Sequence, residues 1–364
     1  MEAHICLPLF LMLESKNILV APLNWGLGHA TRCIPIIKAL IRQKFTPILA
    51  SDGAALLLLQ NEFPELTCLE LPSYNITYSK KGKYFKYKLL KDSPKILKNM
   101  KVEKLATNKI VADYQITGII SDNRFGVYSS EIPSVFMTHQ LQVLSGNTTW
   151  ISTKIHKKII NKFNECWVPD ASGIHNLSGK LGHVETPFSN LKYIGPLSRF
   201  SKKVIPIKYD ILVLLSGPEP QRTFLETRLF KELINFNGSV LLVKGLVENE
   251  IKKEVTNGIT VYNYLTSSLL EEAINESALV ISRSGYTTIM DLVKLEKQAF
   301  FIPTPGQFEQ EYLAERLQEN GLVPYCKQDD FSLEKLQVAK NFKGLSELNY
   351  ELNYNKLFSL FHAK

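Results

Sequence analysis

The sequence predicts an α/β protein built from two Rossmann-like domains, whose parallel sheets face each other across a cleft. Short apolar runs rich in β-branched residues alternate with longer helical patterns, and this series occurs twice along the chain. Continuous apolar strands separated by helices are typical of parallel sheets covered on both faces. The length of 364 residues also exceeds what one ordinary core supports, so two domains are expected.

The two series of elements define the expected domain boundaries. The first holds the strand-like runs NILVAPL, TPILAS, LTCLELP, ITGIISD, SVFMTH and ECWVPD, with the helical patterns RCIPIIKALIRQ, GAALLLLQNEF and STKIHKKIINKF between them. A linker rich in Pro, Lys and Ser follows, from about residue 195 to 208. The second series holds DILVLLSG, SVLLVKG, ITVYNYL, ALVISRSG and AFFIPTPG. We predict an N-terminal domain over 15–195, a C-terminal domain over 209–345 and a terminal helix over 346–364.

Composition narrows the class of protein. The chain is 45% hydrophobic and 21% charged, which is typical of globular proteins. Its five cysteines are odd in number, far apart and without a CxxC pair, which argues against disulfides or a zinc site and favours a reducing, cytoplasmic compartment. The apolar run HICLPLFLML near the N-terminus is shorter than the roughly 20 residues that span a membrane. We assign no role in the fold to residues 1–14.

The stretch NWGLGHATR, residues 24–32, follows the first strand and opens a helix. Gly26 and Gly28 give the start of a dinucleotide fingerprint, but Thr31 stands where the third glycine is required. His29 lies at the predicted helix N-terminus, where the helix dipole disfavours the charged imidazolium and keeps the ring available as a base. The alternative is a histidine that caps the turn and is satisfied by the backbone.

Two more polar residues follow strands of the same sheet. Asp122 ends ITGIISD, and His139 ends SVFMTH. Because the carboxyl ends of parallel strands meet at one edge of the sheet, both are expected near His29. The alternative for Asp122 is a helix cap or an ion pair with Arg124.

The second domain offers candidate groups for a nucleotide sugar. Ser216 and Gly217 form a small turn after its first strand, where backbone amides can hold phosphate oxygens. Ser284 and Gly285 precede a helix whose N-terminus suits a diphosphate, and Asp291 lies about two turns along, where it could reach a ribose diol. Amides and carboxylates after the last strand suit sugar hydroxyls, namely Gln307, Glu309 and Gln310.

The stretches SRSGYTTIMD and FIPTPGQFEQEYLAERL together resemble the C-terminal signature of the family 28 glycosyltransferases. That family includes the N-acetylglucosaminyltransferases that form lipid II and the monogalactosyldiacylglycerol synthases. GLGHATR resembles the family's N-terminal loop GGTGGH, with one glycine fewer. The resemblance implies the GT-B architecture for most of the chain.

The resemblance also implies roles for individual residues. It implies diphosphate contacts for Ser216, Gly217, Arg283, Ser284 and Gly285, recognition of the base by the segment ending at Leu265, ribose contact for Asp291 and a sugar contact for Gln310. It places His29 near the acceptor, and we expect Gly28 to let the backbone approach the nucleotide sugar across the cleft. The chain departs from the family pattern at three places: Pro218–Pro220 replaces a glycine run, Asp291 replaces a glutamate, and Glu311 replaces a glutamine.

The implied activity is an inverting, metal-independent transfer of N-acetylglucosamine or another hexose from a UDP-sugar to a lipid-linked or envelope glycan acceptor. Amides at a helix N-terminus, aided by Arg283, would stabilise the leaving diphosphate. His29 and Asp122 are both candidates for the base, and no cofactor or metal is expected. The alternatives are a nucleotide-sugar 2-epimerase of the same fold and a non-catalytic membrane-associated partner.

A local basic segment completes the sequence evidence. Residues 78–104 carry ten lysines and two acids, interleaved with aromatic residues, and this balance equals the net charge of +8 for the whole chain. Lysines attract anionic headgroups, and aromatic side chains favour the membrane interface. Because the family resemblance places a lipid acceptor near this region, we expect contact with the cytoplasmic face of the membrane. A solvated helical face is the main alternative, and nucleic acid is the least expected partner.

Overall fold

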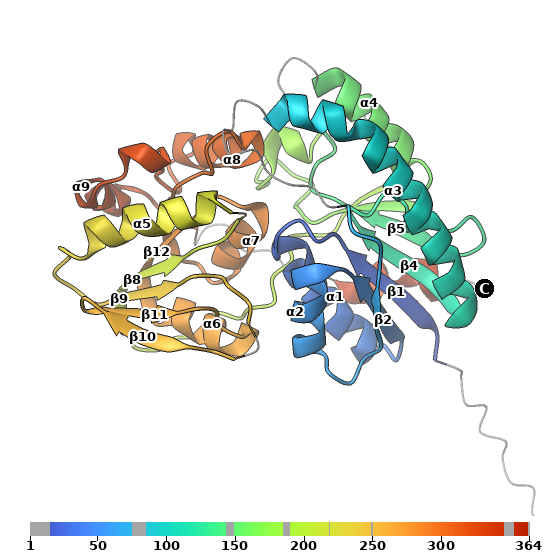
Figure 1. The fold of residues 1–364 in the computed structure, drawn as a ribbon, viewed down its shortest axis with the longest axis horizontal. Coiled ribbons are helices and arrows are strands. Elements are labelled where there is room, and N and C mark those ends of the chain that lie inside the picture. Colours follow the sequence, from blue (N-terminus) through green and yellow to red (C-terminus); the bar gives the residue numbers. More distant parts are fainter. Residues whose placement is uncertain are drawn as a thin grey trace, which may run out of the picture.

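The computed structural model describes residues 15–74, 85–142, 149–184, 190–217, 219–248, 250–345 and 353–362, with the backbone alone for 85–97, 149–152 and 155. These residues form two α/β lobes, each built on one sheet with helices packed against it (Figure 1). The predicted fold class of two parallel-sheet α/β domains is therefore confirmed.

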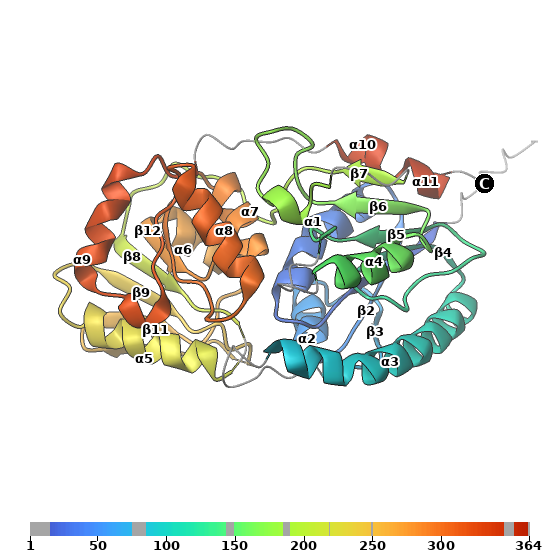
Figure 2. The same cartoon turned by 90° about the horizontal axis from the view of Figure 1, so that it is seen from above.

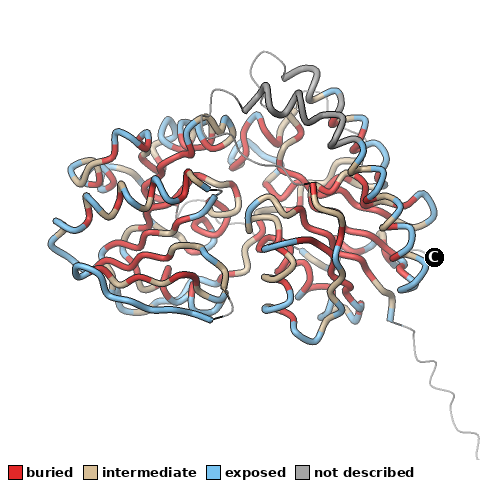
Figure 3. The backbone as a smooth tube through the Cα atoms, viewed as in Figure 1, coloured by how far each residue is buried: buried red, intermediate tan, exposed pale blue. Residues whose placement is uncertain are grey.

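The N-terminal sheet has seven parallel strands in the order β3-β2-β1-β4-β5-β6-β7. Its central strands are buried because their apolar runs face helices on both sides, and the tube view shows this buried layer running through the lobe (Figure 3). The strands are β1 Asn17–Pro22, β2 Thr46–Ser51, β3 Cys68–Glu70, β4 Ile116–Asp122, β5 Ser134–Met137, β6 Glu165–Val168 and β7 Leu191–Tyr193.

The start of the first helix in this lobe places residues 24–32 at the edge of the sheet. The α1 helix begins at Gly28, so His29 is its second residue and Arg32 lies one turn further along. The helices are α1 Gly28–Arg42, α2 Gly53–Glu62, α3 Phe85–Asp113 and α4 Thr149–Ile160, with a 3-10 turn, η3, at Gly179–Leu181.

The C-terminal sheet has six strands in the order β10-β11-β9-β8-β12-β13. They are β8 Tyr209–Leu214, β9 Val240–Val243, β10 Lys253–Thr256, β11 Ile259–Tyr262, β12 Ser277–Ser282 and β13 Gln298–Phe301. The edge strand β10 is antiparallel and exposed along its length, so its sequence KEVT carries no apolar run that would predict it. The helices are α5 Gln221–Leu233, α6 Ser267–Asn275, α7 Tyr286–Lys294, α8 Phe308–Glu319 and α9 Leu333–Leu336, with 3-10 turns η4 Gln328–Asp330 and η5 Gln337–Asn341.

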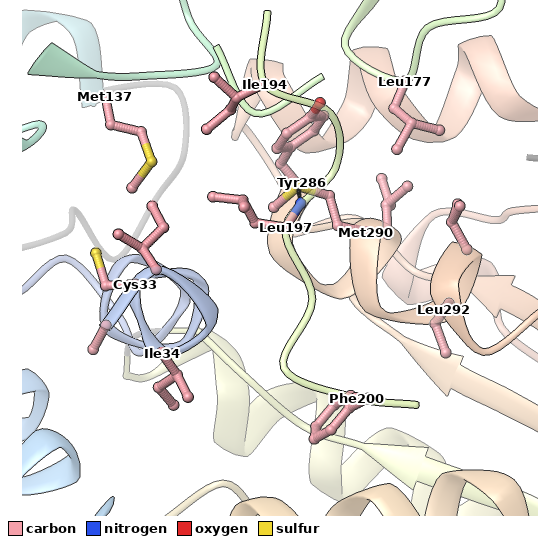
Figure 4. Close-up of a cluster of buried hydrophobic side chains, with 14 of the residues drawn as sticks. Cys33, Ile34, Met137, Leu177, Ile194, Leu197, Phe200, Tyr286, Met290 and Leu292 are labelled. Carbon is pink, nitrogen blue, oxygen red and sulfur yellow. Dashed lines mark hydrogen bonds between the residues drawn. The ribbon is translucent and has the colours of Figure 1, made fainter. Parts of the chain in front are cut away.

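A continuous apolar cluster joins the two lobes. Figure 4 shows Cys33 and Ile34 of α1 on one side and Tyr286 and Met290 of α7 on the other, with Leu197 of the linker near α7. All five side chains are buried. The contact between α1 and α7 therefore fixes the edge of one sheet against the other.

The end of the chain differs from the single terminal helix that the sequence predicts. Within residues 353–362 there are two short helices, α10 Tyr354–Leu357 and α11 Ser359–His362. They pack on the N-terminal lobe, beside α1 and β7 (Figure 2), where Phe358 and Phe361 contact Phe45 and Trp167. The break between the helices lets both phenylalanines enter the same buried cluster.

Several sequence-based expectations fall partly or wholly outside the described residues. Residues 1–14 do, as do residues 78–84 of the lysine-rich segment and residues 346–352 and 363–364 of the expected terminal helix, while residues 85–104 form most of α3. None of the helices in the described part of the chain is long and apolar enough to span a membrane.

The C-terminal segment 353–362 packs on the N-terminal domain and should stabilise it. Because Phe361 is buried among aromatic rings, Phe361→Ala should lower the free energy of unfolding of that domain by about 3–5 kcal/mol. Urea unfolding followed by tryptophan fluorescence measures this, since Trp25, Trp150 and Trp167 all lie in the N-terminal half. The exposed Lys356→Ala is the matched control, and equal stability of the two variants would contradict the prediction.

Candidate active site between the two domains

A histidine and an aspartate meet at the edge of the N-terminal sheet. His29 is in the first turn of α1, Asp122 is the last residue of β4, and Nδ1 of His29 lies 2.9 Å from Oδ1 of Asp122. Asp122 is fully buried, whereas 13% of the His29 side chain is exposed. Nη2 of Arg32 lies equally near Nδ1 of His29, at 2.9 Å, and it also donates to Oδ1 of Asp122. A proton on Nδ1 of His29 can be donated to the carboxylate, and that tautomer leaves the lone pair on Nε2.

Arg32 fixes this carboxylate from the same helix. Its Nε donates to Oδ2 of Asp122 at 2.6 Å, and its Nη2 donates to Oδ1. Burial by itself would raise the pKa of Asp122, but the charges and hydrogen bonds of Arg32 and His29 outweigh it and hold that pKa at about 2. Burial lowers the pKa of His29, and the attraction of Asp122 opposes this only in part. The pair therefore consists of an anionic Asp122 and a neutral His29 near neutral pH.

His139 extends this network into the other domain. Its Nδ1 lies 2.9 Å from Nη1 of Arg32, and its Nε2 lies 2.8 Å from Oε1 of Glu309. The ring of Tyr286 stacks on the ring of His139 with centroids 4.3 Å apart and planes 2° from parallel. The expected gathering of His29, Asp122 and His139 at one edge is thus present in the structure. Glu309, expected to contact a sugar, here contacts the opposite domain.

The alternative pairing of Asp122 with Arg124 is wrong. The Arg124 guanidinium is fully buried and instead forms ion pairs with Asp52 and Glu103. It also donates from Nε to the carbonyl of Pro22, so it holds the ends of β1 and α3 together.

Gly28 lies where the two domains approach most closely at this edge. Thr287, the second residue of α7, donates from Oγ1 to the Gly28 carbonyl at 3.1 Å. A Cβ at position 28 would lie 2.9 Å from that Oγ1, so the contact favours glycine. His29 is therefore one residue from a hydrogen bond to the N-terminus of α7.

Five buried side-chain polar atoms in the described part of the C-terminal domain have no hydrogen-bond partner. Three are oxygens, Oγ1 of Thr304, Oε1 of Gln307 and Oε1 of Gln221, and two are the Nε atoms of Arg283 and Arg316. Thr304 lies about 4.0 Å from the position that a Cβ on Gly217 would take, and Gly217 adopts a φ of +97° in the exposed turn after β8. Buried polar atoms without partners cost stability, which favours a ligand that would satisfy them.

The Arg283 side chain does not reach a diphosphate, which corrects its expected role. Its guanidinium is fully buried and donates to the carbonyls of Ile302, Pro303 and Gln221 and to Oε1 of Gln328. Arg283 therefore ties β12 to the end of β13 and to α5. Its lowered pKa, about 9, comes from this burial.

The turn at Ser284 and Gly285, next to Arg283, is also held by hydrogen bonds within the C-terminal domain. The Ser284 hydroxyl donates to the carbonyl of Gln310 at 2.7 Å, and the Gln310 side chain accepts from the amide of Thr304 at 2.8 Å. Both side chains are buried, and their hydrogen bonds stabilise the turn. Gly285 caps α7, and the backbone amides of the first turn of α7 have no partner within the helix.

Asp291 contacts the linker. Its Oδ1 accepts from the Ser198 hydroxyl at 2.7 Å, and Arg199 lies close enough to attract it. Burial raises the pKa of Asp291 to about 6, more than Arg199 and Ser198 lower it. Leu265, after β11, packs against the apolar cluster shared by the two domains.

Arg32, Tyr286, Thr287 and Thr304 belong to the site but were not among the expected site residues. Arg32 could have been found from its spacing, because residues three apart share one face of a helix with His29. Tyr286 and Thr287 lie inside the SRSGYTT motif, but only the docking of α7 on α1 brings them to His139 and Gly28. Among the described residues no group of three or more His, Cys, Asp and Glu side chains is arranged to hold a metal ion.

The class of protein follows from this architecture and from similar structures. The chain has the GT-B fold, with a TM-score of 0.60 to the glycosyltransferase SnogD from Streptomyces nogalater at 12% identity, covering 96% of this chain and 95% of that one. MurG of Acinetobacter baumannii gives a TM-score of 0.57 at 13% identity, covering 95% of this chain and 99% of that chain. The fold is therefore that of the GT-B glycosyltransferases.

The family is indicated by the sequence comparisons. Residues 223–350 match the glycosyltransferase family 28 C-terminal domain, so the C-terminal domain of this chain belongs to that family. A UDP-N-acetylglucosamine–N-acetylmuramyl-(pentapeptide) pyrophosphoryl-undecaprenol N-acetylglucosamine transferase of Buchnera aphidicola is 25% identical over 62% of this chain and 59% of its own length. An uncharacterized glycosyltransferase of Methanopyrus kandleri is 20% identical over 86% of this chain and 90% of its own. The expected resemblance to family 28 is therefore confirmed over the C-terminal domain.

The buried Asp291 should make stability depend on pH. Its pKa of about 6 lies above the ordinary 3.8, so the folded state favours the protonated form and stability is lost as pH rises from about 4 through 6. This loss amounts to about 3 kcal/mol, and Asp291→Asn should remove it. Urea unfolding followed by circular dichroism at pH 4 and pH 7.5 measures the difference. The same loss in both proteins would contradict the prediction.

Proposed function

We propose that the protein transfers a hexose from a nucleoside diphosphate sugar to an acceptor hydroxyl, with inversion at the anomeric carbon. The observation that carries this proposal is the hydrogen bond between Thr287 and the carbonyl of Gly28. It brings a neutral histidine, held by a buried aspartate, next to the N-terminus of α7. A base and a site for negative charge are the two groups that this reaction needs.

His29 is the base in this proposal, and Asp122 is its positioning partner. Asp122 is fully buried and both of its oxygens already accept from Arg32, so it cannot receive a proton from an acceptor. Nε2 of His29 takes the proton of the acceptor hydroxyl as that oxygen bonds to the anomeric carbon. The bond from this carbon to the diphosphate oxygen breaks, and its electron pair leaves with the nucleoside diphosphate. Attack opposite the leaving group inverts the anomeric centre.

The leaving diphosphate is met by neutral donors of the C-terminal domain. The amides at the N-terminus of α7 and the turn at Ser216 and Gly217 bind its oxygens, in a reaction that we propose to be independent of metal ions. The unpartnered Thr304 hydroxyl can donate to a phosphate oxygen, and the unpartnered Gln307 oxygen can accept from a sugar hydroxyl. Arg283 acts indirectly, by holding the turn in place.

We propose UDP-N-acetylglucosamine or another UDP-hexose as the donor. The name of the Buchnera relative supports this choice. A spinosyn rhamnosyltransferase with a TM-score of 0.60 was solved with thymidine diphosphate, which supports a nucleoside diphosphate site in this fold. Asp291 would bind the ribose by exchanging its hydrogen bond with Ser198 for one from a ribose hydroxyl. The segment ending at Leu265 would contact the base.

For the acceptor we propose a lipid-linked glycan at the cytoplasmic face of the membrane, with the protein bound peripherally. The described part of α3 supports this, because Val102 and Leu105 are 43% and 70% exposed and lie near the exposed Lys98 and Lys101. Exposed apolar side chains beside lysines suit a surface of anionic headgroups.

Nucleotide binding can be tested without knowing the acceptor. Thermal unfolding is measured with UDP, GDP, TDP and their sugars, and a ligand at 100 times its Kd should stabilise the protein by about 2.7 kcal/mol. We expect the largest shift with a UDP compound and a smaller one for Asp291→Ala. The absence of a shift with every nucleotide would contradict the donor assignment.

The role of His29 is tested by turnover. His29→Ala should lower turnover of the bound donor by about 10²–10⁴-fold and leave nucleotide binding intact, because it removes the base but no donor contact. The exposed His175→Ala is the matched control and should keep full turnover. Epimerised donor without transfer would instead support a nucleotide-sugar 2-epimerase. Biological activity that survives both His29→Ala and Asp291→Ala would support a non-catalytic partner.

A further inference from the structure

His139 contacts both domains, and its hydrogen bonds determine its tautomer. A guanidinium can only donate, so Nδ1 of His139 must accept the bond from Arg32. The proton of the neutral ring therefore lies on Nε2, which donates to the carboxylate of Glu309 at 2.8 Å. A proton on Nδ1 would point at the Arg32 guanidinium and break this contact.

Two groups of the C-terminal domain hold the ring in this state. Glu309 bonds its edge, and the second oxygen of Glu309 accepts from the Gln140 amide. Tyr286 stacks on its face, and the hydroxyl of Tyr286 donates to the carbonyl of Pro169 at 2.9 Å. Burial would raise the pKa of Glu309, but the charges and hydrogen bond around His139 outweigh it, so Glu309 is an anion. His139 is itself buried.

We propose that His139 is a positioning residue that couples the docking of the two domains to the orientation of the catalytic base. Glu309 and Tyr286 keep His139 in the tautomer that binds Arg32, and Arg32 in turn holds Asp122 against His29. The inference rests on the proposed function for the catalytic role of His29. It also gives Glu309 a role between the domains, in place of the sugar contact that its position after the last strand suggested.

Loss of Glu309 should change the pKa of His29, although no hydrogen bond joins these two residues in the described part of the chain. The titratable groups around His139 are Arg32, Glu309, Tyr286 and the nearby His29, with Asp122 behind Arg32. Without Glu309, His139 can carry its proton on Nδ1 instead of Nε2. The hydrogen bond from Nη1 of Arg32 to Nδ1 of His139 is then lost. Loss of the Glu309 charge by itself lowers the pKa of His29, because the two groups attract each other. Release of Arg32, whose charge lowers the same pKa, acts in the opposite direction. The His29 pKa should therefore be higher in Glu309→Leu than in the equally uncharged Glu309→Gln.

The direct test is a histidine NMR titration of the full chain, which needs no substrate. With seven histidines in the chain, ¹⁵N-labelled protein gives signals that His29→Ala and His139→Gln assign. In the unmodified protein His139 should carry its proton on Nε2. In Glu309→Leu the His139 tautomers should mix, and the His29 pKa should lie about half a unit or more above that in the equally uncharged Glu309→Gln. Glu309→Gln, which keeps an acceptor, should restore part of the wild-type spectrum.

Control variants separate coupling from a loss of folding. Glu315→Leu changes an exposed residue on the same helix and should leave both histidines unchanged. His139→Asn keeps an acceptor near Arg32 but cannot reach Glu309, whereas His139→Gln keeps a donor near Glu309 but not the acceptor. His139→Gln should raise the His29 pKa, whereas His139→Asn, which keeps the acceptor for Arg32, should change that pKa less. His139→Gln should not add to the effect of Glu309→Leu, because both release the same nitrogen of Arg32.

Kinetics then distinguish the inference from the proposed function. Glu309→Leu should lower kcat about tenfold, leave the donor KM within twofold and place the acid limb of its pH profile above that of Glu309→Gln. A raised donor KM with unchanged kcat would overturn the inference and make Glu309 a sugar contact. A proton on Nδ1 of His139, or the same His29 pKa in Glu309→Leu and Glu309→Gln, would also overturn it. Coupling in the NMR titration without any sugar transfer would leave the inference intact and contradict the proposed function alone.

Discussion

The buried ion pair between Arg32 and Asp122 is the interaction on which the site depends. Both side chains are almost completely buried, and removal of one partner from such a pair typically costs several kcal/mol because the other charge is left uncompensated. The pair joins the second turn of α1 to the end of β4. It keeps Asp122 ionised and occupied, so in our proposal the histidine beside it is the group that takes the proton.

The contact between α1 and α7 extends this arrangement to both domains. Its interior is apolar, with Cys33, Met290 and Leu197 buried together, and its rim carries Thr287 on the Gly28 carbonyl and Glu309 on His139. The apolar part holds the domains together without specifying fine geometry. The polar rim specifies it, because each hydrogen bond requires one orientation of its partners. In our proposal the reaction takes place at this rim.

In the C-terminal domain, the buried Arg283 stabilises the turn before α7. Arg283 satisfies four acceptors on three segments, which fixes the turn before α7 without presenting a charge to the surface. The amides at the helix N-terminus and the Thr304 hydroxyl are left as donors. Donors fixed in advance of the reaction need no reorganisation when charge develops, which is the property that a leaving diphosphate requires.

The sequence by itself determined the two series of parallel strands, the SRSG turn at a helix N-terminus, the position of His29 at another helix N-terminus, and those of Asp122 and His139 at or after strand ends. These follow from local patterns: apolar runs of strand length, small residues before a helix, and the shared edge of parallel strands. Tertiary packing alone decided that Arg32 bonds both Asp122 and His139, that Arg283 turns inward, that Asp291 bonds Ser198, and that the C-terminal segment packs against Phe45 and Trp167. Each of these joins residues far apart in the chain, and such pairings depend on how whole domains dock rather than on any local pattern.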